Sequence, residues 1–309
     1  MRTKKLRVGA TSEYSNDRRR EARRDHAPGA LREGMRPAAF VGLLVMLGGC
    51  PRTRGEPPAS IDAAPATSAA EADAPAAPRV TGDWLQTIDL GGQGFAYVAP
   101  PVGSRDRRPI VVAVHGAGDD PGFMCSAWRS ITDGYPFVVC PAATRVASGR
   151  YTWSSSGQIE QRVLQAIAAT EQRWPENVAV GAPVVYVAFS QGATLAGPVL
   201  TRHGDRITRV VLTEGGYGVF DDRAARAFAK AGGQRVVFSC SSGGCDGGFR
   251  AAVAALGRAS VQAQIEDSGP LGHSIPPPAR EGLNRQLPFL VEGLRGWEGY
   301  AHHPRQTAH

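Results

Sequence analysis

A serine between small residues stands at the end of an apolar run. The pentapeptide AFSQG, residues 188–192, overlaps the run VVYVA and precedes a segment of helical character. A serine hydroxyl attacks a carbonyl carbon once a base takes its proton. At a sharp turn from strand to helix, the residues two before and two after the serine must be small so that the backbones can pass. Ala188 and Gly192 meet this requirement, so Ser190 is the candidate nucleophile.

A glycine-rich segment follows a second apolar run. Residues 115–120, HGAGDD, come directly after PIVVAV, residues 109–114. Glycines allow the backbone to turn so that an N–H group points toward a neighbouring site. Such donors stabilise the oxyanion that forms when a nucleophile attacks a carbonyl group. The two segments together indicate acyl-transfer chemistry.

These segments resemble two motifs of the α/β-hydrolase fold. Residues 188–192 are similar to the nucleophile elbow G-x-S-x-G, with Ala188 in place of the first glycine. Residues 115–118 are similar to the H-G-x-G loop of esterases and lipases. The resemblance covers residues 81–297 and is greatest to small bacterial esterases of the dienelactone-hydrolase and carboxylesterase type. It implies a serine esterase that uses no cofactor and no metal ion.

The resemblance also implies where the oxyanion would bind. One donor is the amide of Gln191, the residue after the nucleophile. The second is expected from the glycine-rich loop, where the amide of Ala117 is preferred and Gly116 or Gly118 is the alternative. His115 precedes these donors and is expected to brace the loop.

In this family an acid and then a histidine follow the serine along the chain. Three later histidines lie in the polar tail, residues 298–309, where no expected element fixes them. His203 falls at the end of a helix, where a cation suits the helix dipole. His273 lies in GPLGHSIPP, residues 269–277, a loop between the last expected strand and the last helix. His273 is therefore the candidate base.

Asp246 is the leading candidate for the acid that orients His273. It lies in a loop rich in Ser and Gly after a short apolar strand. Glu214, which follows the preceding strand, is the alternative, because some hydrolases keep their acid there. Asp221 or Asp222 is expected to cap the next helix.

Alternating apolar runs and helix-length segments must position these residues. Runs that are apolar throughout are typical of strands buried on both faces. Helical spacing predicts a helix over residues 159–174 and a closing helix over 283–294 that Pro288 interrupts. The pattern predicts an α/β fold, with a mostly parallel sheet and helices on both faces, in one domain. The expected strands are residues 95–98, 109–114, 137–140, 184–188, 210–212, 235–238 and 261–265.

Five cysteines divide into one near the N-terminus and four in the predicted domain. In an exported chain, four cysteines are expected to form disulfides, although the sequence alone allows three pairings. Proximity along the chain favours Cys125 with Cys140 and Cys240 with Cys245. No C-x-x-C spacing indicates a metal site.

The net charge of +7 comes mainly from the first 34 residues, which contain ten Lys or Arg and five Asp or Glu. The remainder is almost neutral, which argues against nucleic acid as a partner. Residues 1–34 are interpreted as an upstream extension, because Met35 lies where a compact export signal begins. Residues 51–80 contain ten Ala and six Pro, a composition typical of a tether.

The export signal occupies residues 35–49. A short basic start precedes an apolar core of ten residues, AAFVGLLVML, which is too short to span a bilayer but suits a signal peptide. LGGC, residues 47–50, resembles the lipobox of bacterial lipoproteins, in which the cysteine is acylated. We therefore expect lipidation of Cys50, an anchor in the cell envelope and a tether over residues 50–80.

The expected function is hydrolysis of a small-molecule or polymer ester through an acyl-serine intermediate. A catalytically inactive, ligand-binding lipoprotein is one alternative. A serine peptidase of the prolyl-oligopeptidase kind is another, although the tether before residue 81 leaves no space for the second domain of those enzymes.

Overall fold

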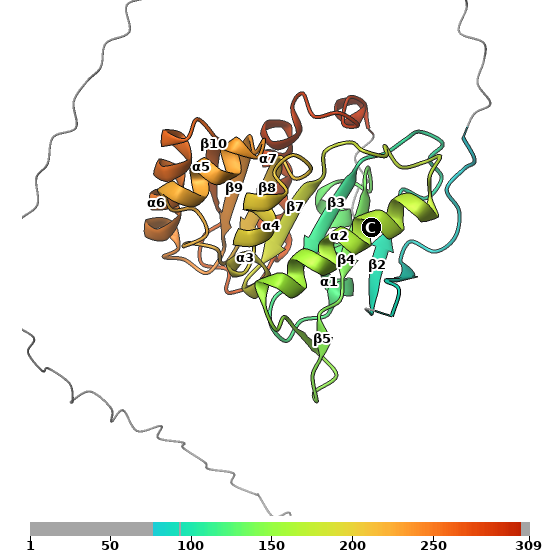
Figure 1. Cartoon of the computed structure of the whole chain (residues 1–309), viewed down its shortest axis with the longest axis horizontal. Helices are drawn as coiled ribbons and strands as arrows, with labels where there is room; N and C mark the ends of the chain where they lie inside the picture. The colour runs from blue at the N-terminus through green and yellow to red at the C-terminus, as the bar shows by residue number, and fades with distance from the viewer. Residues whose placement is uncertain (1–76, 93, 304–309) are drawn as a thin grey trace, which may run out of the picture. The chain divides into compact units, whose positions relative to one another are not determined.

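The computed structural model describes residues 77–92 and 94–303. The expected upstream extension, signal peptide, Cys50 and most of the tether lie outside the described residues. Within the described part, eight strands form one sheet in the order β1-β2-β4-β3-β7-β8-β9-β10 (Figure 1). The strands are β1 Gln86–Asp89, β2 Phe95–Ala99, β3 Ile110–Val114, β4 Phe137–Pro141, β7 Val185–Phe189, β8 Arg209–Thr213, β9 Arg235–Cys240 and β10 Gln262–Asp267.

The sheet is parallel from β4 to β10, and β2 joins both of its neighbours in antiparallel register. All seven strands expected from the sequence are present. The strand β1 was not expected, because it alternates between exposed and buried positions and contains few apolar residues. A small hairpin, β5 Thr144–Arg145 with β6 Tyr151–Thr152, was also not expected, since each strand has only two residues and neither is buried.

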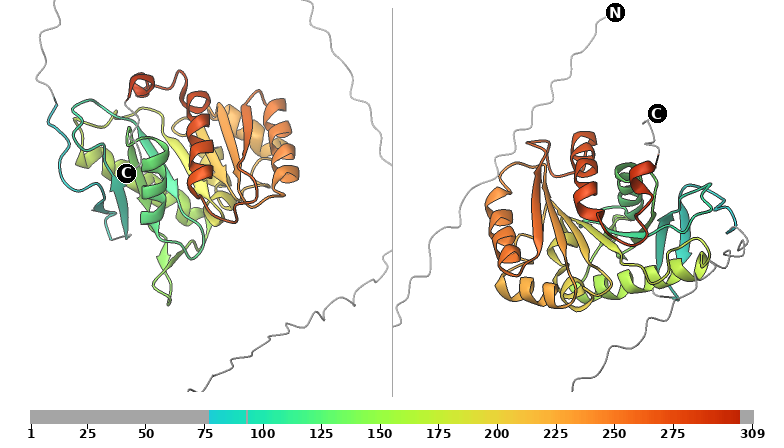
Figure 2. Two further views of the ribbon diagram at one scale, coloured as in Figure 1. Left: turned by 180° about the vertical axis from the view of Figure 1, so that it is seen from behind. Right: turned by 90° about the horizontal axis from the view of Figure 1, so that it is seen from above.

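Helices cover both faces of the sheet, as predicted (Figure 2). The helices are α1 Pro121–Ile131, α2 Ser156–Arg173, α3 Gln191–Thr194, α4 Gly197–Arg202, α5 Asp222–Lys230, α6 Asp246–Arg258 and α7 Pro277–Val291. One apolar core lies under α1 and α7, and the other lies under α2 to α6. The strand β7 serves both cores, with Val185 and Val187 in the first and Tyr186 and Ala188 in the second. This double burial explains why the strand is apolar at every position.

Two details of the helices bear on the predictions. Asp221 caps α5 through a 2.7 Å bond from the amide of Ala224 to its Oδ1, as expected. The closing helix α7 begins at Pro277 and runs through Pro288 rather than being interrupted there. Pro288 stands within the last turn, so it removes a single helical N–H, while Leu290 and Val291 beyond it remain buried.

The ends of the described chain pack against the domain. Val80 is buried and donates its amide to the carbonyl of Ser104. After α7, a 3-10 helix, η1, spans Tyr300–His302. His303 Nε2 contacts the carbonyl of Asp133 at 3.0 Å, so the expectation that nothing fixes this histidine is wrong. No helix in the part that the structure describes is long and apolar enough to cross a bilayer.

The four cysteines of the domain lie in the two pairs that proximity favours. Cys125 in α1 pairs with Cys140 in β4, with 5.8 Å between Cα atoms. Cys240 at the end of β9 pairs with Cys245, with 6.0 Å between Cα atoms. The first pair ties a helix to the sheet, and the second closes the short turn of residues 241–244.

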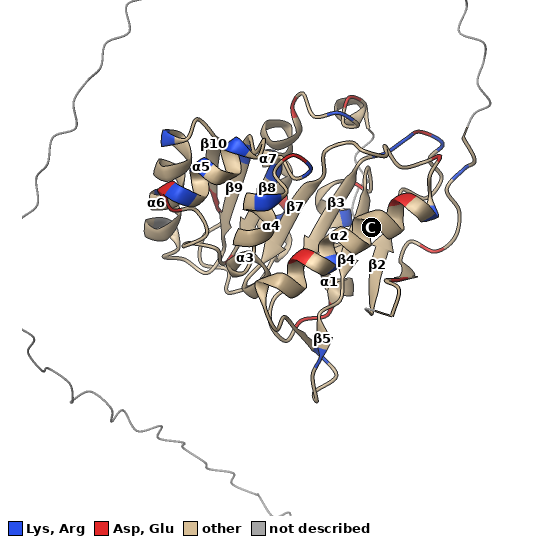
Figure 3. Ribbon diagram, viewed as in Figure 1, with Lys and Arg blue, Asp and Glu red and all other residues tan. Residues whose placement is uncertain are grey.

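Charged residues of both signs are interspersed along the described elements (Figure 3). Helix α2, for example, carries Glu160 and Glu171 as well as Arg162 and Arg173. This mixture agrees with the near neutrality expected for the domain.

Candidate active site

Ser190 stands at a strained turn between β7 and α3. Its backbone has φ 51° and ψ −113°, a conformation that non-glycine residues rarely adopt. A Cβ atom at Gly192 would lie 2.6 Å from the carbonyl oxygen of His115, so only glycine fits two residues after the serine. Ala188 is buried in the core, where its methyl group is accommodated. The segment 188–192 therefore has the geometry that the sequence predicted for it.

His273 lies beside this serine. Its Nε2 is 2.8 Å from Ser190 Oγ, although the two residues are 83 positions apart in sequence. The ring of Phe189 lies 5.0 Å from the imidazole ring and supports it from one side. The predicted pairing of Ser190 with His273 is thus present in the geometry, with Nε2 placed to accept the hydroxyl proton.

Glu214, rather than Asp246, provides the carboxylate next to the histidine. Its Oε2 is 3.2 Å from His273 Nδ1, and its side chain is completely buried. With Nε2 accepting from Ser190, Nδ1 carries the proton and donates it to Glu214. The prediction for the acid is therefore corrected to the alternative, Glu214. Asp246 is the first residue of α6.

Two further observations explain why the acid comes from the end of β8. Glu214 follows β8 directly and has a positive φ of 56°, so its side chain leaves the strand in an unusual direction. The turn after β9 places donors around this carboxylate: the amides of Ser241 and Ser242 donate to Oε1, and the hydroxyl oxygen of Ser241 lies 3.1 Å from it. The loop predicted to supply the acid thus supplies its hydrogen-bond donors.

Close approach also requires glycine after the acid. A Cβ atom at Gly215 would lie 2.5 Å from the carbonyl oxygen of Ser190. The turns after β7 and β8 therefore touch each other. The pair Gly215 and Gly216 directly after Glu214, at the end of a strand, is a signal that could have favoured this acid from the sequence.

The glycine-rich loop lies against the nucleophile. A Cβ atom at Gly116 would be 3.1 Å from Cβ of Ser190. The amide of Gly116 donates to Asp119 Oδ2 at 3.1 Å, and the amide of Gly118 donates to the carbonyl of Tyr151 at 2.8 Å. Ala117 is an exposed residue, and its amide has no hydrogen-bond acceptor among the described residues. Of the three candidates for the second oxyanion donor, the amide of Ala117 is thus the one that remains free to donate.

Gln191 has separate uses for its backbone and its side chain. It is the first residue of α3, where the backbone N–H has no partner within the helix. Its side-chain amide forms two bonds with the backbone of Trp153, at 3.0 and 3.1 Å. The side chain thereby fixes the residue while the N–H stays available for a ligand.

His115 braces the loop, as predicted. It is fully buried, stacks on Trp153 at 4.9 Å, and its Nε2 accepts the amide of Ala143 at 3.2 Å. Its Nδ1 then donates to the carbonyl of Gly116. Burial lowers the pKa of His115 below the ordinary histidine value, which keeps the ring neutral.

The aromatic residues near the site fall into two groups. Trp128 and Trp153 are core residues, and the indole of Trp153 donates to the carbonyl of His115 at 2.9 Å. Phe123 is partly exposed at the start of α1. Tyr217 was not singled out in the sequence, yet it is exposed three residues after the acid, and its ring lies tilted against that of Phe249, with 4.9 Å between ring centres.

Among the described residues, one group brings potential metal ligands together: Glu214, Cys240 and Cys245. The two sulfur atoms are joined in a disulfide, which removes the thiolates that bind metal ions. The carboxylate is occupied by His273 and by the turn after β9. This group does not fit a metal site.

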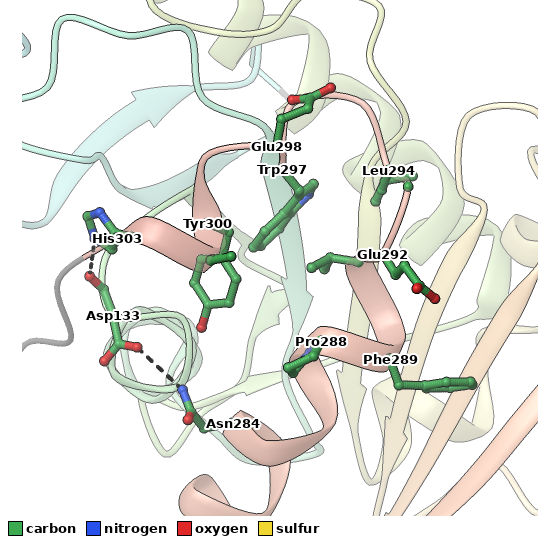
Figure 4. Close-up of a pocket in the computed structure, with 13 residues that line it drawn as sticks. Asp133, Asn284, Pro288, Phe289, Glu292, Leu294, Trp297, Glu298, Tyr300 and His303 are labelled. Atoms are coloured by element: carbon green, nitrogen blue, oxygen red, sulfur yellow. Dashed lines mark hydrogen bonds between the residues drawn. The ribbon is translucent and has the colours of Figure 1, made fainter.

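A cavity of about 880 Å³ lies elsewhere (Figure 4). It is lined by the end of α7 and the segment after it, including Phe289, Trp297 and Tyr300, together with Asp133. Asp133 precedes β4, and Gly296 in the same segment approaches Pro109, which precedes β3. The cavity is therefore at the amino ends of the strands, whereas Ser190, Glu214 and His273 follow carboxyl ends.

Known proteins resemble this chain in structure. No family model and no curated protein matches its sequence. An uncharacterized protein from Bacillus cereus ATCC 10987 superposes with a TM-score of 0.51 at 13% identity. That match covers 60% of this chain and 61% of the other, less than two thirds of its length. A putative dienelactone hydrolase from Klebsiella pneumoniae subsp. pneumoniae MGH 78578 superposes with a TM-score of 0.50 at 13% identity, covering 67% and 98%.

The chain has the α/β-hydrolase fold. The mostly parallel eight-stranded sheet and these two structures establish it, and they confirm the predicted fold class. At such low identity the likeness concerns the fold, so function must be argued from the site.

Proposed function

We propose that this protein is a serine hydrolase that cleaves esters through an acyl-serine intermediate. One observation carries the proposal: Ser190 Oγ, the His273 imidazole and the Glu214 carboxylate form a continuous hydrogen-bonded chain. Such a chain activates a hydroxyl as a nucleophile. The strained turn at Ser190 supports the same reading, because strain of this kind concentrates at functional sites.

The reaction would proceed in two halves. His273 Nε2 takes the proton as Ser190 Oγ attacks the ester carbonyl, and the amides of Gln191 and Ala117 stabilise the oxyanion. His273 then gives this proton to the departing alcohol, and the acyl group stays on Ser190. Water, deprotonated by the same imidazole, releases the acid and restores the hydroxyl. Glu214 holds the imidazole in one tautomer and stabilises its charged form throughout.

Replacement of the nucleophile and of the base tests this proposal. Ser190→Ala and His273→Ala should each lower ester hydrolysis by on the order of 10³-fold or more, and the double variant should be little worse, because the groups act as a unit. A panel of p-nitrophenyl esters of different chain length would measure the rates and the acyl preference. A fluorophosphonate probe should label the wild type at Ser190. Full turnover in Ser190→Ala would overturn the proposal.

We also propose that the protein is anchored in the cell envelope by a lipid on Cys50, a residue outside the described part. The support is the sequence LGGC after a short apolar core. Mass spectrometry of the membrane fraction should find a chain that starts at acylated Cys50, and Cys50→Ala should leave it without lipid. A membrane-bound product that retains residues 1–34 would contradict the anchor.

A further inference from the structure

Ser241 is a buried residue that contacts both the acid Glu214 and the loop that carries His273. It follows β9 and has no exposed surface. Its backbone N–H donates to Glu214 Oε1, and its Oγ lies 3.1 Å from the same oxygen. Its backbone carbonyl accepts the amide of Leu271, two residues before His273. One residue therefore touches the acid and the loop that carries the base.

The hydroxyl of Ser241 lies at the centre of these contacts. Besides Glu214, it has the carbonyl of Ser274 at 2.7 Å and the carbonyl of Gly272 at 3.0 Å. All three partners are acceptors, and a hydroxyl has one hydrogen to give. The carbonyl of Ser274 is nearest, so this hydrogen holds the loop immediately after His273, while the N–H of Ser241 holds the acid.

The position of Ser241 is itself fixed. The preceding residue, Cys240, forms the disulfide with Cys245 that closes the turn. Both sulfur atoms lie within 4.8 Å of a Glu214 carboxylate oxygen. In addition, the amide of Ser242 donates to Glu214 Oε1 at 3.0 Å. The disulfide and these hydrogen bonds thus hold the turn against the buried carboxylate.

We propose that Ser241 is a positioning residue that aligns Glu214 with His273. Its N–H sets the acid, while its hydroxyl and carbonyl set the loop on both sides of the base. This inference rests on the proposed function, since it assigns a role within the same reaction. Ser241 touches no reacting atom, so it would act on the rate only through the pair Glu214 and His273.

The first experiment compares two serine-to-alanine variants, one within β9 and one directly after it. Ser241→Ala keeps the backbone bonds and removes the hydroxyl that holds the loop of His273. Loss of a buried hydrogen bond of this kind should lower kcat by on the order of tenfold, with KM unchanged. Ser239→Ala is the matched control, because Ser239 is equally buried two residues earlier and its hydroxyl has no partner among the described residues. It should keep wild-type kcat.

The second experiment asks whether Ser241 acts through the acid. In a Glu214→Gln background, adding Ser241→Ala should change the rate of fluorophosphonate labelling far less than it does in the wild type, because the alignment is already lost. A purely structural role would give the same factor in both backgrounds and would overturn the inference. Ser241→Thr retains a hydroxyl and should recover most of the turnover lost in Ser241→Ala.

The outcomes separate this inference from the proposed function. If Ser190→Ala and Glu214→Gln both hydrolyse esters at the wild-type rate, the proposed function fails and the role of Ser241 fails with it. If both are severely impaired while Ser241→Ala matches Ser239→Ala, the proposed function stands and the role of Ser241 is wrong. Thermal unfolding of each variant identifies any loss of kcat that comes from unfolded protein.

Discussion

The turns after β8 and β9 differ in how they use their residues. After β8, a non-glycine residue with positive φ, Glu214, points a fully buried carboxylate at His273. After β9, positive φ angles fall on Gly243 and Gly244, and the turn contributes backbone amides instead of a charge. The turn after β8 thus carries the acid, and the turn after β9 provides hydrogen-bond donors for it. The comparison teaches that a buried carboxylate needs its hydrogen-bond donors as much as its partner base.

Among the predictions that compare the two turns, replacing each acid by its amide gives the largest expected effect. Glu214→Gln keeps the size of the side chain but removes the charge that stabilises the imidazolium, so kcat should fall by at least about 10²-fold. Asp246→Asn should change kcat by less than about threefold, because the Nδ1 proton of His273 is directed to Glu214. Steady-state ester hydrolysis measures both. If Asp246→Asn were the more damaging change, the acid that orients His273 would be Asp246 and not Glu214.

The two disulfides offer a second, smaller contrast. Cys240 and Cys245 are 5 residues apart and close the turn around Glu214, whereas Cys125 and Cys140 are 15 residues apart and join α1 to β4. The Cys240→Ser/Cys245→Ser variant should lose kcat by several fold with little change in Tm. The Cys125→Ser/Cys140→Ser variant should keep its kcat and have a lower Tm, since a disulfide that closes a loop of about 15 residues contributes roughly 3 kcal/mol of stability.

Peptide mapping without reductant establishes that both bonds are present before the variants are compared. If the first variant keeps full kcat, then the disulfide does not hold the donors of Glu214, and the turn is rigid without it.

The smallest effect concerns the pH dependence of stability. Burial lowers the pKa of His115 in the folded protein, so in acid the unfolded chain binds more protons. The stability that neutral His115 provides is complete above about pH 6.5 and is lost as the pH falls toward the depressed pKa, at no more than about 1.4 kcal/mol per pH unit. Thermal unfolding between pH 7.5 and 5 should therefore show a shallower decline in His115→Asn than in the wild type.

His302 provides the control for this measurement, because it is exposed. His302→Asn should keep the wild-type slope. An equal slope in wild type and His115→Asn would mean that another group governs the decline in acid.

Much of the fold was predictable because the parallel strands are buried on both faces. Their continuous apolar runs stand out from the helices, as β7 and β3 show. The strand β1 and the hairpin of β5 and β6 were missed since their residues are partly exposed and few. The helix α7 passes Pro288 because burial of the residues around it outweighs the loss of one hydrogen bond.

The candidate site likewise contains residues that could be predicted from the sequence and one that could not. Ser190 and His273 were predictable because the demand for small neighbours and a Gly- and Pro-rich loop is local. The acid was not, because the choice between Glu214 and Asp246 depends on the direction of one side chain at a positive φ and on a backbone donor 27 residues away in sequence. Chain order allows either residue, and only the three-dimensional arrangement of the two turns selects Glu214.

The places where the chain enters and leaves the described domain have a practical consequence. Pro78 accepts a 2.7 Å bond from the side chain of Asn177, which in turn contacts Arg108 at the start of β3 through its carbonyl. A Cβ atom at Gly299 would lie 3.9 Å from the same Arg108 side chain. Both ends of the described chain therefore lie at the amino ends of the parallel strands, opposite Ser190. Immobilisation on a solid support through either end should leave the serine open to substrate, whereas coupling through the β5–β6 hairpin should obstruct it.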